Sequence, residues 1–316
     1  MKEPFSAAME SPTVTVVLCT YNGEKFIDQQ LHPIRNQTYK NLVILISDDA
    51  STDGTWEQLK IHAAADSRIQ LHQNKCNQGY NHNFSQACAG VETPLLAFAD
   101  QDDLWHEEKI ERLVRALRYN TPLIYCDSLT FTGNTPRTAP PKSLYRRFEG
   151  TSILQLGLYN TVNGHAILAR TDFIKKTLPF PPHLFYDWYI AGRAALAGGV
   201  QYLPALLVYQ RMHKSNASVF GERAGQKKTK LMHMVAVSAH CKAFAESPGI
   251  TTESHQRLME WITCLDKLIH QRKAWPSFVF MMRYRADLFY YKKRKIGWPS
   301  QLKHAIGLIQ TYLRNN

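Results

Sequence analysis

The chain has 316 residues, 44% of them hydrophobic and 20% charged, a composition that fits an ordinary globular protein able to bury a full core. Six scattered cysteines without a C-x-x-C pair argue against a disulfide framework or a zinc site and fit a reducing cytosol. The net charge is +12, and residues 226–316 hold 16 Lys and Arg against 5 Asp and Glu, so a basic C-terminal part follows a nearly neutral body.

The first 130 residues alternate apolar runs of strand length with helical patterns. The apolar runs lie at 13–19, 42–47, 69–74, 94–100 and 122–128. Helices are predicted between them at 24–37, 54–65, 83–90 and 107–119. Pro33 should kink or shorten the first of these helices. Repeated alternation of this kind predicts an α/β fold built from parallel βαβ units with right-handed crossovers.

The pattern changes after the fifth strand. A polar loop is predicted at 132–150, a strand at 161–170, a proline-stiffened loop leading into a helix near Asp187, and a strand with a polar end at 200–216. After residue 225 the pattern is helical, with helices predicted at 230–246, 253–273, 278–295 and 300–314. We therefore expect two parts, residues 1–225 and residues 226–316.

Polar clusters follow three of the predicted parallel strands. Tyr21–Asn22 follow the first strand, Asp48–Asp49 the second, and Asp100–Asp103 the fourth. Because functional groups in such sheets gather outside the carboxyl ends of the strands, we expect these side chains to share one site.

The stretch FADQDDLW places three carboxylates within four residues, directly after an apolar run. Such charges repel one another, and each prefers water to an apolar neighbour. A divalent cation would cancel the repulsion, because hard cations take oxygen ligands. The alternative is a solvated acidic turn that caps the helix starting near Trp105. The three clusters at one sheet edge favour the cation site.

The ordered motifs resemble those of family 2 glycosyltransferases with the GT-A fold. They are VVLCTYNGEKFIDQQL, NQTYKN, LISDDASTDGT, NQGYNHNF, FADQDDLW, YDWY and VYQRMHKSNAS, spread over about residues 12–220. The set is similar to bacterial rhamnosyltransferase-like enzymes of O-antigen, capsule and cell-surface polysaccharide synthesis. Pro33 and the Tyr186–Asp187 pair, where this subgroup often has His-Asp, are departures. The resemblance implies a Rossmann-like, mixed and mainly parallel sheet flanked by helices, with a C-terminal helical extension.

The resemblance also implies a nucleotide-sugar site. Nucleoside contacts are expected from Thr20, Tyr21, Asn22 and Asp49, with Asp100, Asp102 and Arg211 completing the nucleotide-sugar site. The alternative for Asp48–Asp49 is a turn, with Ser51 or Asp53 capping the next helix.

The DQDD motif corresponds to the D-x-D element of the family, so Mg²⁺ or Mn²⁺ is expected to bridge Asp102 or Asp103 to the donor diphosphate. His213 is a candidate third metal ligand, although a lone His is more often a packing residue. Arg211 and Lys214 are candidates to neutralise phosphate. Trp105 and Trp188 either line the sugar or acceptor pocket or belong to the core.

Asp187 is expected to be the general base of an inverting enzyme, taking a proton from the acceptor hydroxyl. The alternative is an N-capping aspartate. The implied activity is transfer from a UDP- or dTDP-sugar to a hydroxyl of a glycan or lipid-linked acceptor. Two alternatives remain: a non-catalytic GT-A-like domain that binds nucleotide sugar or nucleic acid, and a nucleotidyltransferase. The basic part shows no nucleic-acid recognition motif, and the first strand lacks a G-x-G-type phosphate loop.

The basic C-terminal part mixes aromatic residues with Lys and Arg, most densely at 278–298. This composition suits an in-plane membrane helix on anionic lipid, while the alternative is packing against the catalytic body or a second subunit. The N-terminus lacks a signal-peptide core, and no uncharged apolar run approaches the roughly 20 residues of a membrane span. We therefore expect a cytoplasmic protein, peripheral on the cytoplasmic face of the inner membrane.

Overall fold

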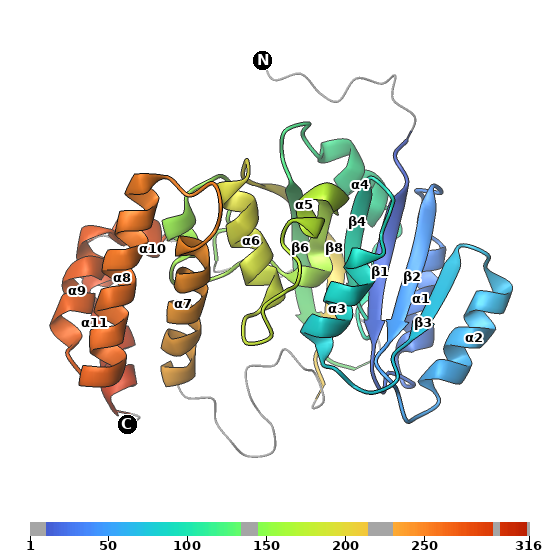
Figure 1. Cartoon of the computed structure of the whole chain (residues 1–316), viewed down its shortest axis with the longest axis horizontal. Helices are drawn as coiled ribbons and strands as arrows, with labels where there is room; N and C mark the ends of the chain where they lie inside the picture. Colours follow the sequence, from blue (N-terminus) through green and yellow to red (C-terminus); the bar gives the residue numbers. More distant parts are fainter. Residues whose placement is uncertain (1–10, 134–144, 214–229, 293–297, 315–316) are drawn as a thin grey trace.

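A computed structural model of the chain describes residues 11–133, 145–213, 230–292 and 298–314 (Figure 1). Eight strands form one sheet in the order β3-β2-β1-β4-β7-β6-β8-β5. The strands are β1 (Val14–Thr20), β2 (Leu42–Asp48), β3 (Ile69–Gln73), β4 (Leu95–Asp100), β5 (Leu104–Trp105), β6 (Leu123–Phe131), β7 (Ile167–Arg170) and β8 (Val200–Arg211). The sheet is mixed and mainly parallel, as the sequence predicts.

The pairing directions show where the parallel half ends. Strands β3, β2, β1 and β4 are parallel to one another, and β6 is parallel to β8. Strand β7 runs antiparallel to both β4 and β6, so it joins the two parallel groups. The two-residue strand β5 pairs antiparallel with β8 and brings the end of β8 beside the turn that follows β4. This junction positions the candidate site.

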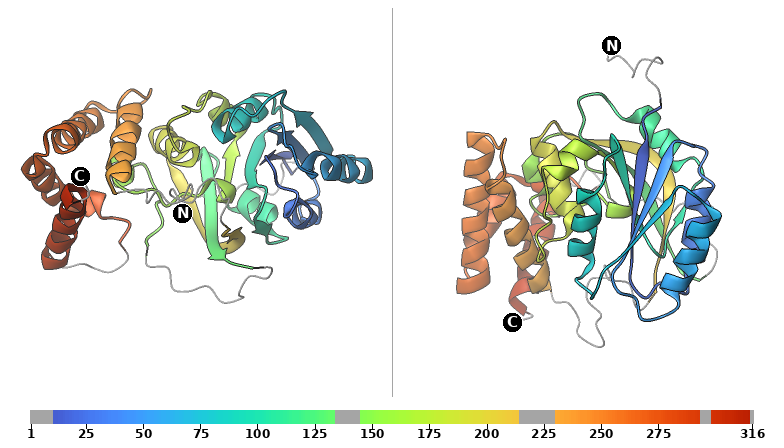
Figure 2. Two further views of the ribbon diagram at one scale, coloured as in Figure 1. Left: turned by 90° about the horizontal axis from the view of Figure 1, so that it is seen from below. Right: turned by 45° about the vertical axis from the view of Figure 1, so that its right-hand side comes forward.

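Helices cover both faces of the sheet. Helices α3 (Tyr80–Ala89) and α6 (Tyr186–Leu196) lie on one face, and α1 (Ile27–Arg35) and α4 (Lys109–Ala116) lie on the other (Figure 2). The remaining helices of this part are α2 (Thr55–Ala65), the short α5 (Thr171–Lys175), and the 3₁₀ turns η1 (Ile153–Leu156) and η2 (Gly164–Ala166). Apolar residues at the centre of β1, β2 and β4, such as Val16, Ile44 and Phe98, are fully buried between the two helical layers.

Several predicted elements differ in extent from the structure. The first helix is shorter than 24–37: Pro33 lies in its last turn, has no N–H to donate to the carbonyl of Gln29, and is followed by only two more helical residues. Of the strand predicted at 161–170, only the last four residues pair, because η2 occupies the residues before them. Strand β5 was not predicted, since two residues carry no detectable periodicity.

The C-terminal helices stack beside α6 in a curved row (Figures 1 and 2). They are α7 (Lys230–Ala245), α8 (Thr252–Gln271), α9 (Ala274–Arg283), α10 (Arg285–Leu288) and α11 (Trp298–Arg314). The single helix predicted at 278–295 is interrupted at Tyr284, and residues 293–295 of the basic run lie outside the described residues. Among the helices that the structure describes, none has the length and apolar character needed to cross a lipid bilayer.

The C-terminal helices share one apolar core with the sheet part. An added Cβ on Gly192 of α6 would lie 2.0 Å from the ring of Phe244 of α7, so the two helices pack closely only because this residue is glycine. Trp261 of α8 is fully buried, stacks on Phe280 and donates a hydrogen bond from Nε1 to the carbonyl of Gly157. Part of the predicted basic C-terminal region therefore packs against the catalytic body.

Candidate active site

A cavity of about 500 Å³ lies at the carboxyl ends of the parallel strands. We call it the central cavity. Residues from several regions line it: the ends of β1 and β2, α3, the DQDD turn after β4, residues 159–165, the start of α6, the end of β8, and α7. Four of the predicted site residues that line it are Thr20, Asp49, Asp102 and Asp187. Ligands of open α/β sheets bind at this edge.

The carboxylates of Asp48 and Asp49 point to different partners. Asp48 accepts hydrogen bonds from Thr20 Oγ1 at 2.8 Å and from Ser51 Oγ at 2.6 Å, so it holds the turn after β2. Asp49 lines the central cavity and accepts backbone hydrogen bonds from Gln78 at 3.0 Å and Gly79 at 2.9 Å. Asp48 thus has the turn role, and Asp49 faces the cavity in which a nucleoside would lie.

Tyr21 and Asn22 separate in the same way. Tyr21 is 43% exposed and lines the central cavity. Asn22 has a φ of 50°, a left-handed conformation that Asn tolerates, and its Oδ1 accepts a hydrogen bond from the Thr52 backbone at 2.8 Å. Asn22 is not among the residues that line the central cavity. Its contact connects the turn after β1 with the turn after β2.

The carboxylates of Asp102 and Asp103, which are adjacent in the DQDD turn, have different partners. Asp102 lines the central cavity, and its Oδ2 lies 2.6 Å from His213 Nε2. Asp103 is 1% exposed; its Oδ1 accepts the backbone N–H of Arg211 at 3.2 Å, and its Oδ2 lies 3.2 Å from His165 Nδ1. The structure therefore separates two carboxylates that the sequence analysis treated as one pair of metal ligands.

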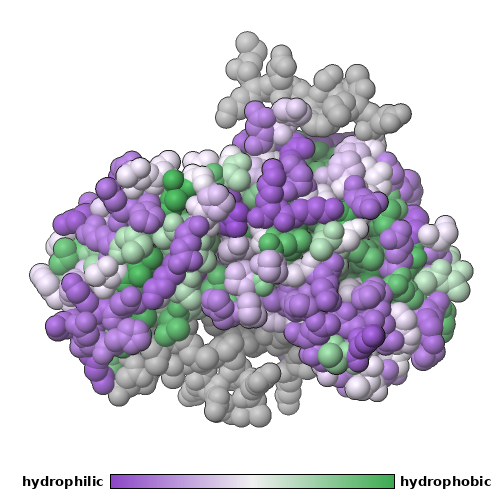
Figure 3. Space-filling view, in the orientation of Figure 1, coloured by the Kyte–Doolittle hydropathy of each residue, from purple (hydrophilic) through white to green (hydrophobic). Residues whose placement is uncertain are grey.

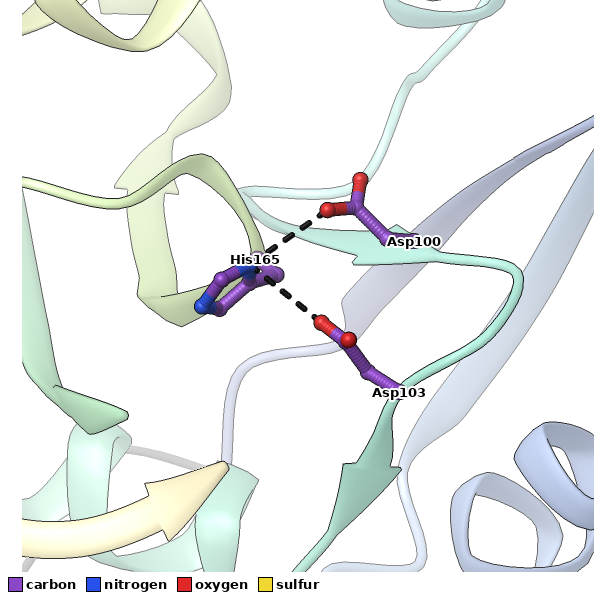
Figure 4. Close-up of side chains that lie close together, drawn as sticks. All are labelled: Asp100, Asp103 and His165. Atoms are coloured by element: carbon purple, nitrogen blue, oxygen red, sulfur yellow. Dashed lines mark hydrogen bonds and ion pairs between the residues drawn. The ribbon is translucent and has the colours of Figure 1, made fainter. Parts of the chain in front are cut away.

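Asp100, Asp103 and His165 form a buried cluster (Figure 4). Both carboxylates point at the imidazole, and Asp100 Oδ2 lies 3.3 Å from Nδ1. Burial, together with the charges of Asp100 and Asp102, raises the pKa of Asp103 to about 8 against the opposing effect of His165. Burial lowers the pKa of His165, but the carboxylates of Asp103 and Asp100 outweigh it and raise that pKa overall.

Lys109 lies against this cluster. Its ammonium donates a 2.6 Å hydrogen bond to the carbonyl of His165 and lies 3.1 Å from the centroid of the Trp105 ring. Burial lowers the pKa of Lys109 to about 7. Trp105 is a buried core residue that does not line the central cavity. In its protonated form, Lys109 would oppose a metal ion at Asp103.

Arg211 is buried beneath the DQDD turn and does not line the central cavity. Its guanidinium donates to the carbonyl of Asp102 at 3.1 Å and to Gln29 Oε1 at 2.7 Å, and it stacks over Phe131. These contacts fix the DQDD turn against β8. The phosphate contact of Arg211 stays a prediction, and Lys214 lies outside the described residues.

Asp187 is the second residue of α6 and lines the central cavity. The N-cap of α6 is Phe185, so the capping alternative does not hold. Burial raises the pKa of the Asp187 carboxyl to about 6, while the backbone N–H groups of Trp188 and Gly164 and the charge of His165 act in the opposite direction. The Trp188 N–H lies 2.6 Å from Asp187 Oδ1. A carboxylate with this pKa can accept a proton near neutral pH.

Tyr159, His165 and His233 are among the lining residues that the sequence analysis missed. His165 precedes the antiparallel strand β7, and only the insertion of β7 beside β4 brings it to the DQDD turn. His233 belongs to α7, in the part expected to be separate from the catalytic domain. No local spacing could reveal either position.

The glycosyl transferase family 2 model matches residues 15–177. An uncharacterized glycosyltransferase of Haemophilus influenzae is 36% identical over 109 residues, which are 34% of this chain and 34% of the relative. The β-1,3-glucosyltransferase WfaP of Escherichia coli, named for UDP-Glc and α-D-GlcNAc-diphosphoundecaprenol, is 25% identical over 233 residues, 72% of this chain and 88% of the relative. In three of the relatives the match covers between 34% and 62% of the relative's length.

Two solved structures share the fold at low sequence identity. The TarS 1–349 complex with UDP-GlcNAc from S. aureus has a TM-score of 0.61 at 13% identity and covers 95% of this chain and 89% of that one. The mannosyltransferase PcManGT of Pyrobaculum calidifontis, in complex with GDP-Man and Mn²⁺, has a TM-score of 0.61 at 16% identity and covers 99% of this chain and 89% of that one. The fold is GT-A, and the chain belongs to glycosyl transferase family 2.

Proposed function

We propose that this protein is an inverting glycosyltransferase that moves a sugar from a UDP- or dTDP-sugar to a hydroxyl of a glycan or lipid-linked acceptor in cell-surface polysaccharide synthesis. The observation that carries the proposal is that the Asp187 carboxylate lines the same cavity as Asp49, Asp100 and Asp102. A binding module needs no buried carboxylate with a pKa of about 6 in its cavity. The UDP-Glc for which WfaP is named and the UDP-GlcNAc in the TarS complex support a UDP-sugar donor, and the diphosphoundecaprenol in the name of WfaP supports a lipid-linked acceptor.

The nucleoside is proposed to occupy the end of the central cavity formed by β1 and β2. Thr20, Tyr21 and Asp49 line this end, and the exposed Tyr21 ring can stack on a base. Hydrogen bonds from Asn74 Nδ2 and from the backbone N–H groups of Gln78 and Gly79 fix the orientation of the Asp49 carboxylate at this end. Asp100 at the end of β4 then faces the ribose or diphosphate.

A divalent cation, Mg²⁺ or Mn²⁺, is proposed at Asp102 and His213. Their side chains lie 2.6 Å apart, and Asp102 faces the central cavity. Burial and the charge of Asp100 raise the pKa of Asp102 against the opposing effect of His213, so a bound cation would favour the ionised carboxylate. Bound there, the cation would offset negative charge on the leaving nucleoside diphosphate. The Mn²⁺ named with PcManGT supports this choice.

Asp187 is proposed to accept the proton of the acceptor hydroxyl. The acceptor oxygen forms a bond to the anomeric carbon while the bond from that carbon to the diphosphate oxygen breaks. The diphosphate leaves with the electron pair, and attack opposite to it inverts the anomeric centre. Burial of Asp187 makes it a stronger base than an exposed aspartate, because its pKa lies nearer the working pH.

The decisive experiment is a screen of UDP-, dTDP- and GDP-sugars for release of the nucleoside diphosphate, with and without Mn²⁺. We expect metal-dependent release from a UDP- or dTDP-sugar that rises when acceptor is present. Tight nucleotide binding without any release, with every donor and in extracts containing acceptor lipid, would instead identify a non-catalytic binding protein.

We further propose that α9 attaches the protein to the cytoplasmic face of the inner membrane. The outward face of α9 is apolar: Trp275 is 72% exposed, Val279 is 36% exposed, and Phe278 and Met282 are half-buried beside them. Exposed basic residues flank this face at both ends of the helix: Arg272, Lys273, Arg283 and Arg285. An apolar stripe between basic residues fits the headgroup boundary of an anionic bilayer. In the orientation of Figure 3, hydrophobic and hydrophilic residues are interspersed over the C-terminal helices.

A further inference from the structure

We propose that Tyr159, Trp188 and His233 form a subsite that binds a pyranose ring of the acceptor, on the side of Asp187 away from the nucleoside end. All three residues line the central cavity. Trp188 is only 3% exposed, so it supports the ring of His233 from behind, while Tyr159 and His233 are half-buried. The inference rests on the proposed glycosyltransferase function and adds to it where the acceptor lies and what chemical face of it is recognised. It also gives the C-terminal helix α7 a direct part in substrate binding.

The order of the elements places this subsite. Asp49 follows β2, Thr20 ends β1 and Asp100 ends β4, and these strands are consecutive neighbours in the sheet. Beyond β4 in the same direction come α6, which carries Asp187, and then α7 (Figure 1). The cavity therefore runs from the nucleoside end, past the proposed base, to a wall that includes the side chain of His233. A donor bound along the cavity would not cover this wall, so the wall can bind the acceptor.

The rings of this wall are held by one another. The centroids of Trp188 and His233 lie 6.4 Å apart with nearly parallel planes, and those of Tyr159 and His233 lie 6.5 Å apart. Tyr159 also stacks on Tyr145 at 5.3 Å and on Tyr291 at 4.7 Å. The rings are thus fixed before a ligand arrives, which lowers the entropy cost of binding.

The chemistry of the wall suits a sugar and not a phosphate. Aromatic faces bind the apolar C–H face of a pyranose, while Asn160 and Asn163 beside them offer amide groups to its hydroxyls. Burial lowers the pKa of His233, so its imidazole is neutral near pH 7 and does not attract an anion. Tyr159 and His233 remain half-buried, so their rings are not fully covered by protein neighbours.

His240 lies about two turns after His233 on α7 and connects the wall to the proposed base, Asp187. Its Nε2 accepts the backbone N–H of Phe185 at 3.1 Å, and its ring stacks on Trp188 at 4.3 Å. Phe185 is the N-cap of the helix that carries Asp187. Helix α7 therefore holds both the start of α6 and the ring of Trp188, which keeps the proposed subsite in register with the base.

The test measures binding of methyl α- and β-pyranosides of glucose, galactose, mannose and rhamnose by saturation-transfer NMR, with UDP and Mn²⁺ present. We expect at least one to bind the wild type through ring protons. Tyr159→Ala and His233→Ala should each weaken that binding by about fivefold or more, and Tyr159→Phe should retain it, because the ring is kept. The UDP affinity should stay unchanged in all three variants.

Trp275→Ala is the matched control, because this exposed aromatic residue lies on α9 and does not line the central cavity. If Tyr159→Ala fails to fold, His233→Leu, which keeps an apolar side chain of similar size, takes its place. Absence of pyranoside binding by the wild type, or unchanged binding by the alanine variants, would overturn the subsite. Failure of the proposed function looks different, because the wild type would then release no nucleoside diphosphate from any donor.

Discussion

Asp102 Oδ2 and His213 Nε2 lie 2.6 Å apart, although 111 residues separate them in the chain. Strand β5 makes this contact possible, because its pairing with β8 brings residues 208–209 beside Leu104 and Trp105. The histidine that follows β8 therefore reaches the carboxylate that follows β4. Asp102 lines the central cavity, and His213 contacts Asp102 from the end of β8. A carboxylate oxygen and an imidazole nitrogen are suitable ligands for Mn²⁺ and acceptable ones for Mg²⁺.

Asp102→Asn and His213→Ala should each weaken UDP binding in the presence of Mn²⁺ by about tenfold or more. Without metal, the affinity of the variants should be close to that of the wild type, because the ligands act through the cation. Isothermal titration calorimetry with UDP, with Mn²⁺ or with EDTA, measures both values. Asp103→Asn is the matched control, since Asp103 is buried against His165 and does not line the central cavity. Equal UDP affinity of the wild type with and without Mn²⁺ would contradict the metal site.

Asp187→Asn should lower kcat by roughly 10²–10⁴-fold and leave the UDP affinity nearly unchanged, because only the proton acceptor is lost. The pKa of Asp187 is raised to about 6, and a base works only when deprotonated, so kcat/KM of the wild type should rise with pH through about 6 and then level off. The residual activity of the variant should not show this rise with pH. Steady-state rates between pH 5 and 8 measure it, with the exposed Asp172→Asn as control.

Retention of full turnover by Asp187→Asn would remove this residue from the mechanism. If the residual rate of Asp187→Asn still rises with pH through about 6, the titrating group is not Asp187. The neighbouring cluster of Asp100, Asp103 and His165 is the first such candidate, because its members lie close enough to interact with Asp187.

The sequence predicted the parallel half of the fold and the edge of the sheet at which the central cavity lies. Strands β1, β2 and β4 are continuous apolar runs, and each ends in polar residues, so both the layer and its functional edge are encoded locally. Asp49, Asp102 and Asp187 line one cavity as expected from the order of these elements.

The remaining site residues depend on long-range pairing. His165 reaches Asp103 through the antiparallel strand β7, and Arg211 lies under the DQDD turn because β8 pairs with β5. The direction of a short strand is not written in its hydrophobic pattern, so neither contact could be derived from spacing. Likewise, the apolar residues of a helix such as α7 indicate that the helix is packed, but they do not indicate which element it packs against.

His240 should make the stability of the protein pH-dependent. The imidazole is fully buried; Nδ1 donates to the carbonyl of Ala236 at 2.7 Å and Nε2 accepts from Phe185, an arrangement that requires the neutral ring. Burial lowers its pKa from 6.5 to about 4. The imidazole is therefore protonated below about pH 6.5 in the unfolded chain but only below about pH 4 in the folded chain. Because protonation then favours the unfolded state, the free energy of unfolding falls as the pH drops from 6.5 to 4.

The expected loss from this one group is on the order of 3 kcal/mol between pH 7.5 and pH 4. His240→Gln should be less stable at pH 7.5 but should lack this part of the pH dependence. Urea unfolding at pH 7.5, 6 and 5 measures it, with the exposed His72→Gln as the control variant. An identical pH dependence in His240→Gln and the wild type would show that folding does not shift the pKa of His240.

Membrane attachment through α9 is tested best by changing its surface and keeping the rest of the chain. A chain ending near residue 225 would lack α7, whose Phe244 packs against Gly192 and whose His240 holds the start of α6, so its behaviour would report misfolding as well as lost binding. Trp275→Ser combined with Val279→Ser removes the two most exposed apolar side chains of α9 and leaves its buried face intact.

In flotation with phosphatidylglycerol-containing vesicles, we expect the wild type to float, and the fraction bound to fall with rising salt and with falling anionic lipid content. The double variant should stay in the unbound fraction under all these conditions, because the apolar face that enters the headgroup boundary is lost. Tyr119→Ser is the matched control, since Tyr119 is 73% exposed but lies on the catalytic part, far along the chain from α9. Binding that ignores lipid charge and salt, or that the double variant retains in full, would mean that α9 is a solvated face and that another surface meets the acceptor's membrane.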